Sequence, residues 1–275
     1  MIESHRTELA DLVDSFAREH QCPSISWGVI ADGELALHGS SGELSNDTTP
    51  TERTVYRIAS MTKSFTAAVV LLLRDEGAFQ LDDPISRHAP ELAALIGPAE
   101  DAAPITIAHL LSMGSGFATD DLWADRHLDI TDAELDTVIA SGGLFAASPG
   151  TAFEYSNLGY ALIGRVIKRV SGHRVQEHVS NRLLPALGMK RTTWIMPGHH
   201  DWAHPYRHQD GTTVRESAPI GDGELAPMGG IWTCVADLAR WISWMDDAFP
   251  AGASSAAKKA SLTSLRRGEV ALWSR

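Results

Sequence analysis

The chain has 275 residues, a hydrophobic share of 44%, a charged share of 21% and a formal net charge of −12. This length can bury a large core, in one large domain or in two interleaved domains. The composition is that of an ordinary soluble globular protein. The acidic balance argues against nucleic acid or an anionic membrane as a partner.

Targeting and redox signals are weak. The first residues are polar and lack an apolar signal core, and no run of 18 apolar residues occurs, so a cytoplasmic protein without a membrane span is expected. The two cysteines, Cys22 and Cys234, are too few for a disulfide framework and have no metal-ligand spacing.

The first 76 residues combine helix and strand signals. Apolar residues at helical spacing predict an amphipathic helix within the first twenty residues. The strand-like runs 25–30 and 34–38 are joined around Asp32 and Gly33, a dipeptide typical of hairpin turns. A strand-like run, 54–59, then meets a helix that we expect to begin at Ser60, as an N-cap, and to end at Gly77.

Helical patterns dominate the middle of the chain. We expect helices at 85–95, at 104–112 with Thr106 at its start, at 132–140, at 157–171, at 175–184 up to Pro185, and at 236–246. Residues 189–225 are polar, rich in Gly, His and Pro, and are predicted to be a loop.

This order predicts an α+β fold of the α/β-sandwich type, an antiparallel sheet flanked by helices with an inserted all-helical domain. The expected domains are an α/β domain formed by 1–76 and by a return segment, 226–250, and a helical domain, 77–225. Residues 251–275 have a basic composition, typical of a solvated tail.

The junction at Ser60 has the composition of a nucleophile site. Lys63 follows three residues later, so both side chains lie on one helix face. A hydroxyl beside a partly desolvated amine can be activated, because burial lowers the pKa of the lysine and lets it accept a proton. The same spacing also fits an N-cap serine with a solvated lysine, and it recurs at Ser255 and Lys258.

A second candidate group is Tyr155-Ser-Asn157, after the turn at 148–150. A phenolate beside a lysine ammonium is stabilised and can carry a proton from a serine to a leaving group. Asn157 can orient Lys63 and bind a substrate carbonyl, because its side chain has both donors and acceptors. A buried tyrosine with a helix-capping asparagine would leave the same pattern.

Together the two groups resemble the serine β-lactamase and penicillin-binding-protein superfamily, whose first motif is Ser-x-x-Lys. Tyr-x-Asn as the second motif is similar to class C β-lactamases, related esterases and D-aminopeptidases. The segments Ile105-Thr-Ile-Ala-His-Leu-Leu-Ser-Met-Gly-Ser-Gly116 and Pro227-Met-Gly-Gly-Ile-Trp232 carry the same resemblance, which covers roughly 29–249.

The resemblance implies a serine hydrolase that forms an acyl-enzyme on Ser60 and acts on a small ester, a β-lactam or a D-amino-acid amide. Lys63 and Tyr155 would move the proton, Asn157 would bind substrate, and the backbone N–H of Ser60 would stabilise the oxyanion. A small molecule is the only partner implied, with no metal and no other cofactor.

One family feature is missing after Asn157. Family members carry Lys or His, then any residue, then Gly, on a late strand that completes the sheet and the oxyanion site; the nearest candidate here is 266–268. Truncation, or a shifted reading frame after Pro250, is one hypothesis for this loss. The alternative function is therefore a truncated, catalytically impaired family member that acts at most as a binding protein.

Two further patterns are compatible with a binding site. Histidines 199, 200, 204 and 208 suggest a metal site, although Pro205 interrupts their helical spacing and a surface loop explains them as well. The pocket loops are expected near 120–127 and 196–223. Their aromatic residues fit either a hydrophobic pocket or ordinary core packing: Trp123, Trp194, Trp202 and Tyr206.

Overall fold

The computed structural model describes residues 5–95, 97–99, 101–124, 126–198, 201–209, 211–216 and 221–247. These residues form two compact units. The first takes its described residues from 1–58, 183–219 and 231–247, and the second from 59–182 and 220–230. The first boundary between the units lies at 58/59 rather than at the predicted limit 76/77, because the helix after Ser60 packs with the helical segments that follow it. The final return to the first unit lies at 230/231 rather than at 225/226.

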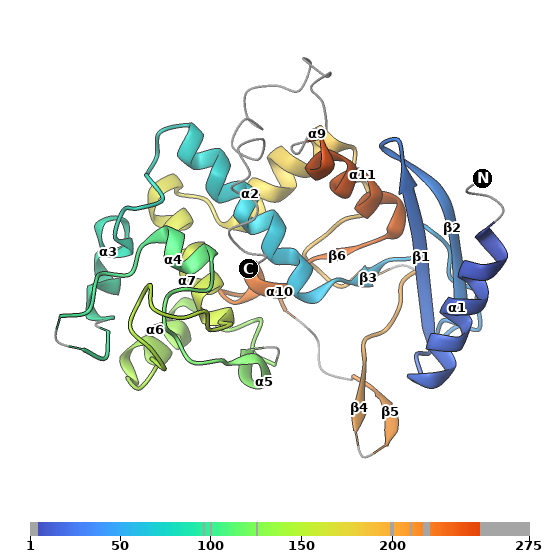
Figure 1. Cartoon of the computed structure of the whole chain (residues 1–275), viewed down its shortest axis with the longest axis horizontal. Coiled ribbons are helices and arrows are strands. Elements are labelled where there is room, and N and C mark those ends of the chain that lie inside the picture. The colour runs from blue at the N-terminus through green and yellow to red at the C-terminus, as the bar shows by residue number, and fades with distance from the viewer. Residues whose placement is uncertain are drawn as a thin grey trace. The chain divides into compact units, whose positions relative to one another are not determined.

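The first unit contains antiparallel strand pairs and helices (Figure 1). Its elements are α1 (Arg6–Glu19), β1 (Ser24–Ala31), β2 (Glu34–Gly42), β3 (Tyr56–Arg57), α9 (Leu184–Leu187), β4 (Tyr206–Gln209), β5 (Thr212–Arg215), β6 (Trp232–Thr233) and α11 (Val235–Asp246). Among the described residues the strands pair only as β1 with β2, β3 with β6, and β4 with β5.

The predicted hairpin is present. β1 and β2 pair from Ser24 opposite Gly42 to Ala31 opposite Glu34. Asp32 and Gly33 both have positive φ, 52° and 79°, as the tight turn between two twisted strands requires. Both α1 and α11 contact this hairpin, which supplies the packing that an isolated two-stranded ribbon lacks.

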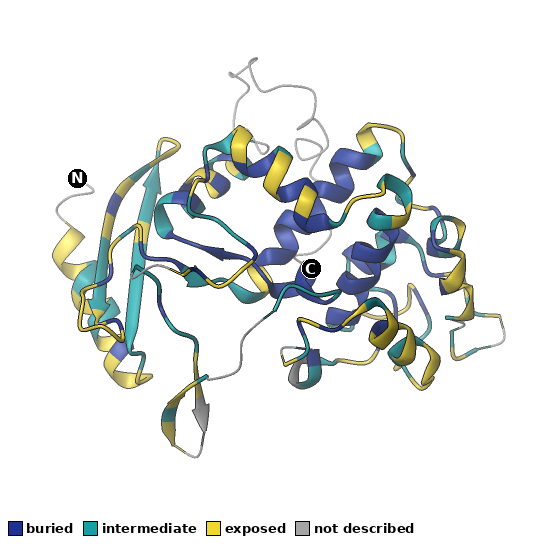
Figure 2. Ribbon diagram, turned by 180° about the vertical axis from the view of Figure 1, so that it is seen from behind, coloured by how far each residue is buried: buried dark blue, intermediate teal, exposed yellow. Residues whose placement is uncertain are grey.

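The secondary-structure elements among the described residues of the second unit are all helices, joined by loops. Its elements are η2 (Ala59–Met61), α2 (Thr62–Asp75), α3 (Ile85–His88), η3 (Pro90–Ala94), α4 (Ile107–Leu111), α5 (Asp121–Ala124), α6 (Asp132–Ala140), α7 (Asn157–Ser171), α8 (Val175–His178), η4 (Val179–Leu183, which ends at the unit boundary) and α10 (Ala226–Gly229). Every residue of α2 from Thr62 to Leu73 is buried, as are the first eleven residues of α7. These two helices contact each other and α10, and they are the core of the unit (Figure 2).

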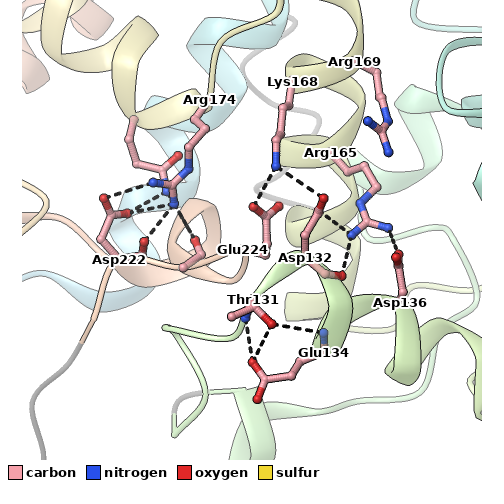
Figure 3. A network of polar contacts seen from close by, with 12 residues as sticks. Thr131, Asp132, Glu134, Asp136, Arg165, Lys168, Arg169, Arg174, Asp222 and Glu224 are labelled. Atoms are coloured by element: carbon pink, nitrogen blue, oxygen red, sulfur yellow. Dashed lines mark hydrogen bonds and ion pairs between the residues drawn. The ribbon is translucent and has the colours of Figure 1, made fainter.

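A buried arginine joins α6 to α7. Arg165 of α7 is 1% exposed and pairs with Asp132, at 2.8 Å, and with Asp136 (Figure 3). A buried charge is tolerated only when it is paired and hydrogen bonded. Because both carboxylates come from one helix face, this ion pair fixes how α6 lies on α7.

Several predicted limits are wrong. The helix after Ser60 begins at Thr62, with no side-chain cap, because the Ser60 hydroxyl has other partners, described below. Pro185 does not end the helical segment but lies in the first turn of α9, where a missing N–H costs nothing. The predicted loop, 189–225, contains the β4–β5 hairpin.

Candidate active site

Ser60 is presented by a strained turn rather than by a regular helix start. It lies in η2, a 3-10 helix of one turn, and Ala59 before it has a left-handed φ of 45°. A residue with a Cβ rarely adopts this conformation, and such strain concentrates at functional sites. The Ser60 side chain is exposed although the helix that follows it is buried.

Lys63 lies beneath this serine and is 3% exposed. Its Nζ is 3.0 Å from Ser60 Oγ, 2.7 Å from Asn157 Oδ1 and 2.9 Å from the Met228 carbonyl oxygen. The buried amine therefore contacts two pure acceptors and the serine hydroxyl. The ring of Tyr160 is centred 5.5 Å from the same nitrogen.

Tyr155 completes the contacts of the serine. Its hydroxyl is 2.7 Å from Ser60 Oγ, and Lys63 Nζ is 4.9 Å from its ring centroid. The residues predicted from two segments 95 positions apart thus meet at one oxygen atom. Tyr160, by contrast, is sealed in the core, where burial raises the pKa of its hydroxyl, and donates to the Leu111 carbonyl at 3.2 Å.

Asn157 is oriented by Asp120, which the sequence analysis placed only in a loop. One carboxylate oxygen accepts from the backbone N–H of Asn157, at 2.8 Å, and from its Nδ2, at 3.1 Å. The other accepts from the backbone N–H of Leu158, at 2.8 Å. The local signal was slight, an acidic residue suited to a helix N-terminus that lies 37 positions later in the chain.

A backbone carbonyl is the second group that sequence analysis missed. The oxygen of Met228, on α10, accepts from Lys63. The neighbouring Pro227 carbonyl accepts from Thr66 Oγ1 at 2.7 Å. Thr66 lies one turn after Lys63 on α2, so one helix face binds two successive carbonyls of α10. No side-chain pattern in the sequence marks a carbonyl acceptor.

Ion pairs hold the segment that leads into α10. Arg174 donates to the Asp222 carbonyl oxygen at 2.8 Å, and Lys168 Nζ lies 3.3 Å from Glu224 (Figure 3). Backbone hydrogen bonds also attach this segment to the 128–130 turn. The Met228 carbonyl is therefore part of a framework anchored at several points.

The described residues contain no helix long and apolar enough to cross a membrane. They also contain no group of three or more His, Cys, Asp or Glu that could hold a metal ion. Of the histidines weighed as ligands, His204 lies 2.8 Å from an Arg215 nitrogen and packs on the Trp202 ring. His199, His200 and the candidate third motif at 266–268 lie outside the described residues.

The aromatic residues of the predicted pocket loops have different environments. Trp194 is buried at 5% exposure, and Trp202 packs edge-on against the Trp232 ring. Trp123 stacks on the His127 ring, and Tyr206 is exposed. Packing within the protein therefore explains three of these four side chains.

A family model described as Beta-lactamase matches residues 9–273. The chain belongs to the Beta-lactamase family. The resemblance stated from the two motifs is thereby confirmed, and so is the mixed helix-and-sheet fold. The site residues match that resemblance one by one, but their roles are proposals.

Individual relatives are more distant. The chain is 28% identical over 243 residues to Protein flp of Staphylococcus aureus strain MW2, covering 86% of this chain and 48% of that one. It is 27% identical to the D-alanyl-D-alanine-carboxypeptidase/endopeptidase AmpH of Escherichia coli K12, covering 85% and 61%. The chain thus spans about half to three fifths of the length of these relatives.

Solved structures show the same fold. The octameric penicillin-binding protein homologue from Pyrococcus abyssi superimposes with a TM-score of 0.74 and is 26% identical, covering 87% of this chain and 56% of that one.

Proposed function

We propose that this protein is a serine hydrolase that forms an acyl-enzyme on Ser60. The observation that carries the proposal is the double contact of Ser60 Oγ, with Lys63 Nζ at 3.0 Å and with the Tyr155 hydroxyl at 2.7 Å. A nucleophile and its base within hydrogen-bond reach, the base being held by a third group, is the arrangement that nucleophilic catalysis needs.

The contacts of Lys63 suit a neutral amine as the base. Two N–H groups can donate to Asn157 Oδ1 and to the Met228 carbonyl, which leaves the nitrogen lone pair directed at the Ser60 hydroxyl. Ser60 Oγ then attacks the substrate carbonyl carbon, and its proton passes to the amine.

Collapse of the tetrahedral intermediate breaks the bond to the leaving group. Tyr155 gives its proton to the departing oxygen or nitrogen and is reprotonated from Lys63. A water molecule then attacks the Ser60 ester with the same pair as base, which releases the acid and restores the serine.

We propose three substrate classes, an ester, a β-lactam and a D-amino-acid amide. The similarity to the Escherichia coli D-alanyl-D-alanine-carboxypeptidase/endopeptidase favours the third. Each presents a carbonyl that a serine can acylate, and each can be supplied as a small molecule. No metal or organic cofactor enters the proposed steps.

The test is hydrolysis of a short-chain nitrophenyl ester together with covalent labelling by a fluorescent penicillin. Ser60→Ala should lower the hydrolysis rate by about 10³-fold or more and abolish labelling. Ser141→Ala is the matched control, since Ser141 ends α6 and its hydroxyl donates to the Val138 carbonyl. Hydrolysis that survives Ser60→Ala would reject the proposal.

The second candidate is a protein that binds without turnover. It is the function of a family member without the second oxyanion donor, because loss of one such donor costs about 10²–10³ in rate. Labelling of Ser60 that forms and persists, without release of product from the ester, would select this function.

A further inference from the structure

We propose that Asp120 is a positioning residue that fixes which end of the Asn157 side-chain amide faces Lys63. The proposal rests on the function proposed above. It starts from the two bonds between one Asp120 carboxylate oxygen and Asn157, to the backbone N–H at 2.8 Å and to Nδ2 at 3.1 Å.

The chemistry of the two ends explains the need for such a group. The oxygen and nitrogen of an asparagine amide have nearly the same shape, so packing alone does not choose between them. A carboxylate only accepts hydrogen bonds, and therefore it selects the NH₂ end of Asn157. The oxygen then faces Lys63 Nζ at 2.7 Å.

The opposite orientation would disable the lysine. It would direct the NH₂ group of Asn157 at a buried amine, so that donors would oppose donors and one acceptor of Lys63 would be lost. The contacts of Lys63 Nζ with the Met228 carbonyl and with Ser60 Oγ would remain. The amine would then lose the contact that helps to keep its lone pair directed at the Ser60 hydroxyl.

Helix capping alone does not account for Asp120. The start of α7 already has an N-cap, because the Ser156 hydroxyl accepts from the Gly159 N–H at 3.2 Å. Asp120 adds acceptors for Asn157 and Leu158, the first two residues of α7. Its negative charge also suits the positive end of this 15-residue helix. The bond to Nδ2 contributes nothing to a helix cap, and it is this bond that reaches the active site.

The experiment is a double-mutant cycle on the rate of Ser60 labelling by a fluorescent penicillin. Asp120→Asn is expected to slow labelling by about 10- to 100-fold, the loss typical of a misplaced catalytic group. In an Asn157→Ala background the same substitution should change the rate less than about threefold, because the amide that Asp120 orients is gone. Equal effects in both backgrounds would overturn the proposal.

Two further variants separate positioning from stability. Asp120→Glu keeps an acceptor-only group and should label several-fold faster than Asp120→Asn. Thr131→Ala removes the hydroxyl that caps α6 through the Glu134 N–H, at 3.3 Å, away from Ser60. It should lower the melting temperature about as much as Asp120→Asn while leaving labelling unchanged. A labelling rate that follows melting temperature across all variants would contradict the proposal.

A readout without chemistry distinguishes this inference from the proposed function. The chain has three asparagines, 46, 157 and 181, so [¹⁵N]asparagine labelling gives three pairs of side-chain amide signals in an NMR spectrum, and Asp120→Asn adds a fourth pair. The Asn157 pair, assigned by its loss in Asn157→Ala, should exchange with water slowly and should exchange faster in Asp120→Asn. If Ser60 is not labelled by the penicillin but the exchange rates differ, the proposed hydrolase function is rejected and the role of Asp120 stands. If the exchange rates do not differ, the role of Asp120 is rejected.

Discussion

Ala59, which has a left-handed φ, and Ser60 lie at the start of the segment that carries the candidate nucleophile. The φ of 45° at Ala59 turns the chain from β3 into η2, and the turn leaves the Ser60 hydroxyl in contact with Lys63 and Tyr155 instead of a backbone N–H. A Cβ in this conformation costs about 1–2 kcal/mol. The surrounding contacts must offset that cost.

A branched side chain at this position should make the strain visible. Ala59→Val is expected to lower the free energy of unfolding by about 1–3 kcal/mol and to slow Ser60 labelling, because β-branched residues resist positive φ. Ala133→Val is the matched control, exposed and in the regular helix α6. Urea unfolding should show about 0.5 kcal/mol or less for the control. If both variants lose the same free energy of unfolding, the backbone at Ala59 is not strained.

At the scale of elements, the contact between α7 and α10 places the Met228 carbonyl. A Cβ built at Gly164 of α7 would lie 2.8 Å from Pro227 Cγ, so only glycine lets α10 approach at this point. At Gly159, on the same helix, the nearest atom to a built Cβ is 3.7 Å away, an ordinary contact.

The two glycines therefore predict opposite outcomes for the same substitution. Gly164→Ala should destabilise by about 1–3 kcal/mol through overpacking and should slow Ser60 labelling as α10 shifts. Gly159→Ala should be neutral or stabilising by up to about 1 kcal/mol, because alanine favours a helix. Thermal unfolding and labelling of both variants check this, and a harmless Gly164→Ala would show that α10 tolerates displacement.

At the scale of the whole molecule, stability should depend on pH through Asp83. The Gln80 backbone N–H and then His88, at 2.9 Å each, hydrogen bond to its carboxylate, while Arg87 adds a positive charge, and together they lower the pKa of Asp83 below its ordinary 3.8. The folded state therefore binds fewer protons here than the unfolded state. This contribution is complete above the unfolded pKa and is lost as pH falls through the folded pKa.

Asp83→Asn should consequently lower the melting temperature at pH 7 by several degrees. The difference from the unsubstituted protein should shrink as pH falls below about 4. Asp11→Asn, at an exposed position on α1, should follow the unsubstituted protein throughout. Melting curves across pH 3–7 measure both variants. If the difference in melting temperature between Asp83→Asn and the unsubstituted protein stays constant at low pH, the Asp83 carboxylate is not its source.

Local chemistry made much of the fold predictable. Asp32 and Gly33 predicted the β1–β2 hairpin, Thr106 the start of α4, and Gly77 the end of α2, because turns and caps depend on neighbouring residues. The β4–β5 hairpin was missed although Gly211, with a left-handed φ of 78°, directly precedes its return strand. Its short polar strands carry little hydrophobic alternation, the signal that distinguishes a strand from a loop.

The sequence by itself determined the family, because its two motifs have distinctive chemistry at distinctive spacing, and it supplied four candidate site residues: Ser60, Lys63, Tyr155 and Asn157. Only the tertiary structure decided what surrounds them. The Met228 carbonyl has no side-chain signature, and Asp120 accepts hydrogen bonds from Asn157, 37 positions later in the chain. Such contacts depend on how helices pack, and packing is a property of distant residues together rather than of any local pattern.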